Sequence, residues 1–164
     1  MDYELAYRYG APSRLDEGAG LALATLGGST PEGEAAHPYF FSGFMERPDV
    51  VAAGLLAVAR VARTRFYVPP GMVVAPGGGL TRIGMLDPVV TSTAEGLRFE
   101  SFSVCCGVYA RLDVEASALD ATHRAVGVTN VDVNQPLRAA LASLRAGEPL
   151  HLDVGEEGLT ATTL

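Results

Sequence analysis

The two cysteines of the chain are neighbours, Cys105 and Cys106, in the stretch SFSVCCGVYARLDV at residues 101–114. A cysteine thiolate can act as a nucleophile, as a redox centre or as a metal ligand. A zinc site needs further ligands, which usually come in closely spaced cysteine or histidine pairs. The histidines lie far from one another in the sequence: His37, His123 and His151. The spacing therefore predicts no metal site.

Residues 102–114 alternate between apolar and mostly polar side chains, which is typical of a half-buried strand. In an unbroken strand, Cys106 lies on the core face and Cys105 on the opposite face, so both are structural. However, the apolar face switches near Ser101, which indicates a bulge or a turn, and Gly107 weakens a strand interior. If the strand breaks at residues 105–107, Cys105 is exposed and becomes the candidate reactive thiol.

No other stretch assembles a catalytic site from its spacing. The loop PGGGLTR at residues 76–82 lacks the phosphate-binding pattern and is predicted to be a flexible loop. No nucleophile, base and orienting residue can be combined from neighbouring positions. We therefore assign no catalytic residue and expect no cofactor.

Two groups of side chains are candidates for a partner surface. The stretch HPYFFSGF at residues 37–44 contains an aromatic cluster, which either packs in the core or lines a partner groove: Tyr39, Phe40, Phe41 and Phe44. Arg138 and Arg145 lie seven residues apart on an expected helix and would share one of its faces. They would contact an acidic partner, although a solvated helix face is the default explanation for such residues.

The remaining elements predict an α+β fold. An apolar stripe that begins at Val51 predicts a helix over about 48–66, and Asn134 caps a second helix over 135–146. Residues 89–103 and 149–164 are expected to form hairpins, residues 127–133 form a short strand, and residues 27–38 are rich in turns.

These hairpins favour an antiparallel sheet with two main helices, built from two similar strand–helix–strand units. The length of 164 residues suits a single domain, 1–164, or two fused halves, 1–115 and 116–164.

Composition and charge restrict what the chain binds and where it is located. Its net charge of −7 argues against a broad nucleic-acid surface, so we expect no nucleic-acid binding by this domain alone. The N-terminus has no basic-then-apolar leader, and no apolar run is long enough to span a bilayer. Two cysteines form no disulfide framework. We expect a cytoplasmic protein that does not associate with a membrane.

Several stretches together resemble the N-terminal region of actinobacterial proteins of the SWIM zinc-finger family. They include HPYFFSGF, DPVVTS, LRFESFSVCCGVYARLDV and TNVDVNQPLRAALASL. A SWIM finger has a C-x-C and a C-x-H pair, both of which are absent from this sequence, so no zinc ligand is carried over. The resemblance implies an accessory domain that precedes the finger, and it agrees with a chain that is the N-terminal part of a longer protein.

These observations lead to three functional hypotheses. The first is a non-catalytic interaction domain, which contacts a protein partner or further domains of its own chain. The second is a small thiol enzyme or redox sensor that uses Cys105. The third is a DNA-associated module similar to a sliding-clamp subdomain, which rests on an analogy of topology.

Overall fold

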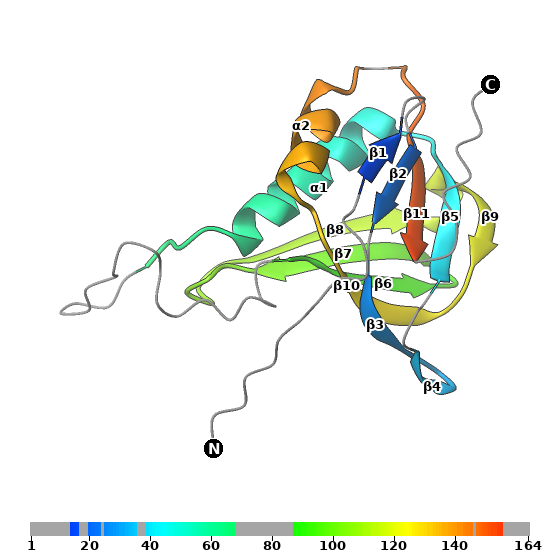
Figure 1. Cartoon of the computed structure of the whole chain (residues 1–164), viewed down its shortest axis with the longest axis horizontal. Coiled ribbons are helices and arrows are strands. Elements are labelled where there is room, and N and C mark those ends of the chain that lie inside the picture. Colours follow the sequence, from blue (N-terminus) through cyan, green and yellow to red (C-terminus); the bar gives the residue numbers. More distant parts are fainter. Residues whose placement is uncertain are drawn as a thin grey trace.

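A computed structural model describes residues 14–16, 20–23, 25–35, 39–67, 87–145 and 147–155. Within these ranges the chain forms two α-helices and eleven strands, which are arranged in two sheets (Figure 1). The predicted α+β class is confirmed. His37, the loop at residues 76–82 and the last nine residues of the expected hairpin at 149–164 lie outside the described residues.

The first sheet has five strands in the order β1-β2-β11-β5-β9. Their bounds are β1 Arg14–Asp16, β2 Gly20–Leu23, β11 His151–Gly155, β5 Tyr39–Met45 and β9 Leu119–Arg124. The pair β2–β11 is parallel, whereas the other pairs of this sheet are antiparallel.

The second sheet has six antiparallel strands in the order β4-β3-β10-β6-β7-β8. Their bounds are β4 Gly33–Ala35, β3 Thr25–Thr30, β10 Gly127–Val131, β6 Val89–Thr93, β7 Gly96–Phe102 and β8 Tyr109–Glu115. The predicted hairpin at 89–103 corresponds to β6 and β7. The pair β3–β4 occupies part of the region for which only turns were expected.

Strands from both sides of residue 115 occur in each sheet. In the first sheet β11 lies between β2 and β5, and in the second sheet β10 lies between β3 and β6. The chain passes almost directly from β2 into β3 and from β9, at Arg124, into β10, at Gly127. The segments 1–115 and 116–164 therefore share both sheets.

Helix α1 spans Pro48–Ala62 and covers one face of β7 and β8 (Figure 1). Its buried side chains follow the predicted apolar stripe, and Leu55 is completely buried. On β7 they meet Leu97 and Phe99, which are also buried. The helix ends four residues earlier than predicted, because the N–H of Arg63 and the hydroxyl of Thr64 both donate to the carbonyl of Arg60.

Helix α2 spans Gln135–Ser143 and packs against α1. Asn134 is its N-cap, as predicted, since its side-chain oxygen accepts the N–H of Leu137 at 3.0 Å. The helix ends at Ser143 instead of residue 146, because Leu144 adopts an extended conformation (φ −61°, ψ 129°).

Replacing Asn134 with alanine should lower the free energy of unfolding by about 1 kcal/mol, because the N–H of Leu137 loses its acceptor at the start of α2. Asn134→Ser should recover most of that loss, since serine is an equally good N-cap. Urea unfolding of the three proteins measures the difference. Equal stability of the alanine and serine variants would contradict a capping role for this side chain.

Candidate functional site

The two cysteines lie in a turn that connects β7 to β8, so the prediction of one unbroken strand over 102–114 is wrong. Two backbone hydrogen bonds close the turn. The N–H of Cys106 donates to the carbonyl of Ser103 at 2.8 Å, and the N–H of Ser103 donates to the carbonyl of Val108 at 2.8 Å. Cys106 has a positive φ of 55° and is exposed, whereas a core position was expected for it. The alternative prediction, a break at residues 105–107, is confirmed.

The turn explains why the apolar face switches along this stretch. On β7 the inward side chains are at odd positions, such as Leu97 and Phe99, and on β8 they are at even positions, such as Leu112 and Val114. The register pairs Phe99 with Leu112 and Leu97 with Val114, so all four face α1. The six residues of the turn, 103–108, therefore connect a strand whose inward positions are odd-numbered to a strand whose inward positions are even-numbered.

The Cys105 sulfur is surrounded by hydrogen-bond donors. The backbone N–H of Phe66 donates to Sγ at 3.3 Å, and the hydroxyl of Ser103 lies 3.4 Å from it. Ser103 Oγ also accepts the N–H of Val108 at 3.0 Å, which leaves the hydroxyl proton available for the sulfur. The N–H of Val104 donates to the carbonyl of Thr64, and this bond fixes the turn against the segment after α1.

These donors stabilise the thiolate. The hydrogen bond from Ser103 has the largest effect, the backbone at Gly107, Phe66 and Tyr67 adds to it, and together they lower the pKa of Cys105 to about 6. Cys105 is partly exposed. At neutral pH the sulfur is therefore mostly a thiolate that a small reagent can reach.

A protein base is not placed beside this thiol within the described ranges. His123 lies on β9, where its Nε2 contacts the carbonyl of Tyr39, and His151 lies on β11, where it contacts Ser42. Both strands belong to the first sheet, whereas Cys105 is at the end of the second. Activation of this sulfur therefore comes from hydrogen bonds and not from a neighbouring imidazole.

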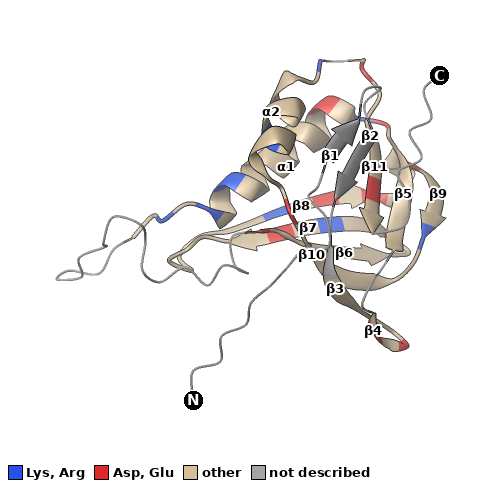
Figure 2. Ribbon diagram, viewed as in Figure 1, with Lys and Arg blue, Asp and Glu red and all other residues tan. Residues whose placement is uncertain are grey.

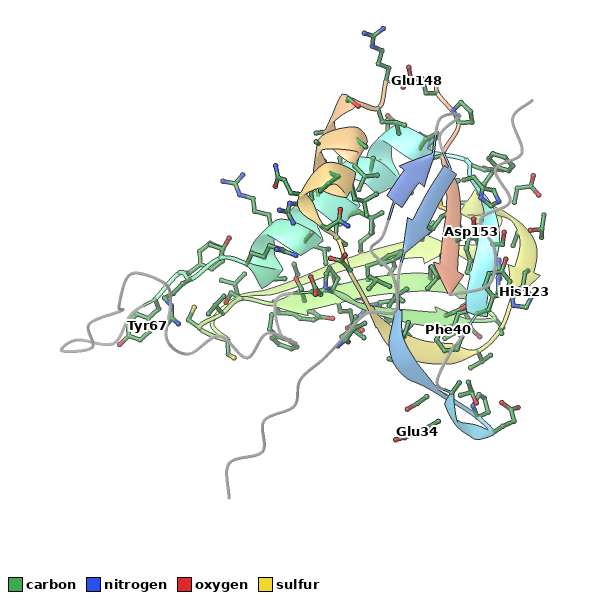
Figure 3. All side chains as sticks on the ribbon, viewed as in Figure 1. Glu34, Phe40, Tyr67, His123, Glu148 and Asp153 are labelled. Atoms are coloured by element: carbon green, nitrogen blue, oxygen red, sulfur yellow. The ribbon has the colours of Figure 1, made fainter. Side chains whose placement is uncertain are left out.

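Four exposed aromatic side chains lie around the end of the β7–β8 hairpin, which we call the aromatic end. Phe66 and Tyr67 follow α1 beside Cys105, and Phe102 and Tyr109 lie on the outer face of the two strands. Their exposed fractions are between 47% and 59%. The rings of Phe102 and Tyr109 pack across the two strands with centroids 5.0 Å apart. Figure 3 shows Tyr67 beside the end of the β7–β8 hairpin. Sequence spacing does not reveal this group, because its members come from two segments more than thirty residues apart.

The predicted aromatic cluster on β5 does not form a surface. Phe40 and Phe41 are almost completely buried (1% and 0% exposed) and belong to the core, so they contribute nothing to a partner groove. Tyr39 and Phe44 are partly exposed, and their rings contact histidines. Tyr39 stacks on His123 at 4.5 Å, and Phe44 meets His151 edge-on at 4.7 Å.

Arg138 and Arg145 do not share a helix face, because α2 ends before Arg145. Arg138 donates to the carbonyl of Val133 at 2.6 Å and to Gln135 at 2.7 Å, so its guanidinium binds its own helix start. Burial lowers the pKa of Arg138, and the positive charge of Arg63 adds to this effect. Arg145 is exposed in the turn after α2, where its N–H donates to Glu148.

A second polar cluster, which spacing alone did not reveal, lies on the first sheet. Ser42 Oγ is 3.3 Å from Nε2 of His151, and Nδ1 of the same ring is 3.2 Å from a carboxylate oxygen of Asp153. The register pairs Ser42 with Asp153 across β5 and β11. Figure 3 labels Asp153 on this sheet. One signal was present in the sequence, since the order His-Leu-Asp puts His151 and Asp153 on one face of a strand.

Neither a cluster of metal-ligating side chains nor a helix that could span a membrane occurs in the described ranges. They contain no group of three or more histidine, cysteine, aspartate or glutamate side chains that is placed to hold a metal ion. Neither helix in this part of the chain has the length and hydropathy needed to span a lipid bilayer.

Comparisons with known proteins give no family for this chain. No protein-family model, no curated protein and no solved structure matches it.

Proposed function

We propose that this chain is an interaction domain that binds a protein partner, or a further domain of its own chain, through the aromatic end. The observation that carries the proposal is the exposure of four aromatic side chains at one end of a well-packed fold. Tyrosine and phenylalanine are enriched at the centres of protein interfaces, where their large rings lose water on binding.

The surroundings of the aromatic end support this role. On the outer face of β7 and β8, Arg98 and Arg111 both pair with Asp113, at 2.8 and 2.5 Å. Tyr109 donates to Glu100 on the neighbouring strand. Figure 2 shows acidic and basic residues interspersed along β7 and β8. An aromatic centre beside a rim of paired charges is the usual anatomy of a protein interface.

The resemblance to the N-terminal region of SWIM zinc-finger family proteins supports the same role, since it implies an accessory domain. Both cysteines are free thiols, which fits the reducing cytoplasm that we propose as the location. The charge pattern does not favour the DNA-associated alternative. With a net charge of −7, we expect little affinity for duplex DNA.

Replacing Phe66 and Tyr67 with serine should weaken partner binding about tenfold or more, because each buried aromatic ring at an interface contributes about 1–2 kcal/mol. The backbone N–H groups that face the Cys105 sulfur remain in this double variant. Binding is measured with the purified chain as bait and by light scattering over a range of concentrations, which also detects self-association.

Val50→Ser is the control, because Val50 is also an exposed apolar side chain (47%) but lies at the opposite end of α1. It should bind like the wild type. A wild-type chain that stays monomeric and captures no partner would count against the proposal. Equal losses for the control and the double variant would exclude the aromatic end as the contact surface.

A second function, a reactive thiol at Cys105, is supported by one specific observation. The donors around Sγ hold the pKa of Cys105 at about 6, so the sulfur is nucleophilic at neutral pH. We propose reversible oxidation or thiol exchange as the chemistry, because both need only a thiolate and an incoming oxidant or disulfide. Exposed Phe66 and Tyr67 adjoin this sulfur, so modification would change the surface that binds the partner.

A further inference from the structure

The polar cluster on β5 and β11 has the connectivity of an activated serine. A carboxylate only accepts hydrogen bonds, so Asp153 requires the proton of a neutral His151 ring to be on Nδ1. Nε2 is then an acceptor, and the hydroxyl of Ser42 donates to it over 3.3 Å. This is the order of nucleophile, base and orienting carboxylate that acyl-transfer sites use on unrelated folds.

The side chains of the cluster are largely shielded from water and lie beside an apolar ring. The side chains of His151 and Asp153 are only 20% and 13% exposed, and Ser42 is 7% exposed. The ring of Phe44 meets His151 edge-on and supplies an apolar wall. In such a setting the hydrogen bonds are stronger than in water, and the apolar ring favours an apolar acyl group over a charged one.

The sheet holds the three side chains in place. Leu152 and Val154 alternate with His151 and Asp153 along β11 and are fully buried in the core. Ser42 and Asp153 face each other across β5 and β11 in an unbroken part of the register. A site on two central strands of a packed sheet keeps its geometry better than a site on a loop.

We propose that Ser42, His151 and Asp153 form an acyl-transfer site for small esters with an apolar acyl group, in which Ser42 is the nucleophile. Ser42 Oγ attacks the ester carbonyl carbon while its proton moves to Nε2 of His151. The bond to the leaving alkoxide then breaks, and the alkoxide takes that proton. Water hydrolyses the Ser42 ester by the same route, which releases the acid and restores the hydroxyl.

The proposal is tested with the whole chain and two small probes, diisopropyl fluorophosphate and p-nitrophenyl acetate. We expect one phosphoryl adduct per chain, located on Ser42 by peptide mass spectrometry, together with release of p-nitrophenol above the buffer rate. Ser42→Ala should abolish the adduct and reduce p-nitrophenol release to the rate that the Cys105 thiolate alone supports, which is measured by adding Cys105→Ser to that variant. His151→Gln should slow the phosphorylation of Ser42 by about 100-fold or more, because a general base contributes at least that factor.

Ser117→Ala is the control, since Ser117 is an exposed serine outside the cluster, and it should react like the wild type. Circular dichroism shows whether each variant is folded, but the decisive result comes from the wild type alone. A folded wild-type chain that gains no adduct on Ser42 overturns the proposal. So does labelling that persists at the same rate in a folded His151→Gln protein.

Discussion

Replacing Gly127 with alanine should lower the free energy of unfolding by about 2–3 kcal/mol, because the new methyl group would overlap the ring of Phe40. Gly127 is buried on β10, and Phe40 is fully packed in the core, so the ring has little room to move. Alanine has less conformational freedom in the unfolded chain, which favours folding by only about 0.5–1 kcal/mol. The steric cost is larger and determines the sign.

Urea unfolding measures this loss, and a second substitution tests its cause. If the ring of Phe40 is responsible, Phe40→Leu should cost less in the Gly127→Ala background than in the wild type, so the two losses are not additive. Gly107→Ala is the control. A methyl group there would have only Cys105 Sγ nearby, at 3.6 Å, and should change stability by less than about 0.5 kcal/mol. Strict additivity of the first pair would contradict the packing explanation.

Features that depend on nearby residues were predictable from the sequence. The stripe of α1 repeats every three to four residues, and the N-cap of α2 acts over three residues, so both helices were found with their starts correct. Their ends were placed three or four residues too far. At Arg63 the N–H bonds to a carbonyl three residues back, and Leu144 adopts an extended conformation, but no proline or glycine marks either position.

Strands were harder to predict, because their partners lie far away in the sequence. The strand β5 has four consecutive buried residues, Phe40, Phe41, Ser42 and Gly43, so it shows no alternation between buried and exposed positions. It was interpreted as an aromatic cluster. Strand β9 contains only partly exposed or exposed residues and was not predicted at all. Both β5 and β9 form strands because they pair with neighbouring strands of the first sheet.

The candidate sites show the same limit. The alternation on both sides of the cysteines favours a strand, whereas the phase switch near Ser101 and the glycine at 107 indicate a break. The positive φ of Cys106 and the bonds of Ser103 decide for the turn. Ser42 and His151 are 109 residues apart, and the register between β5 and β11 brings them together. Spacing cannot reveal a contact that depends on register.

The rate at which Cys105 reacts with iodoacetamide should be half-maximal near pH 6 and constant above about pH 7, because its pKa is lowered to about 6. The rate for free cysteine, which has a pKa of about 8.5, should keep rising up to about pH 9. At pH 7 the two rates should be similar, since a low pKa also makes the thiolate less nucleophilic. At pH 5.5 Cys105 should react about tenfold faster.

The measurement uses a chain with Cys106→Asn, so that one thiol remains and the positive φ of that position is tolerated. Adding Ser103→Ala removes the donor with the largest effect, so the midpoint should move to higher pH. Free cysteine is the reference thiol. If Cys105 instead shows a midpoint near that of free cysteine, the sulfur is not activated and the second function fails.

The same pKa has a consequence for stability, which separates an activated thiol from one that is merely accessible. The folded state lowers the pKa of Cys105, so the thiolate contributes stability that is fully present above the unfolded value, about 8.5, and is lost as the pH falls through about 6. The difference in stability between the wild type and Cys105→Ser should therefore grow from pH 6 to pH 9. A difference that is independent of pH would mean that the hydrogen bonds of Phe66 and Ser103 do not favour the charged sulfur.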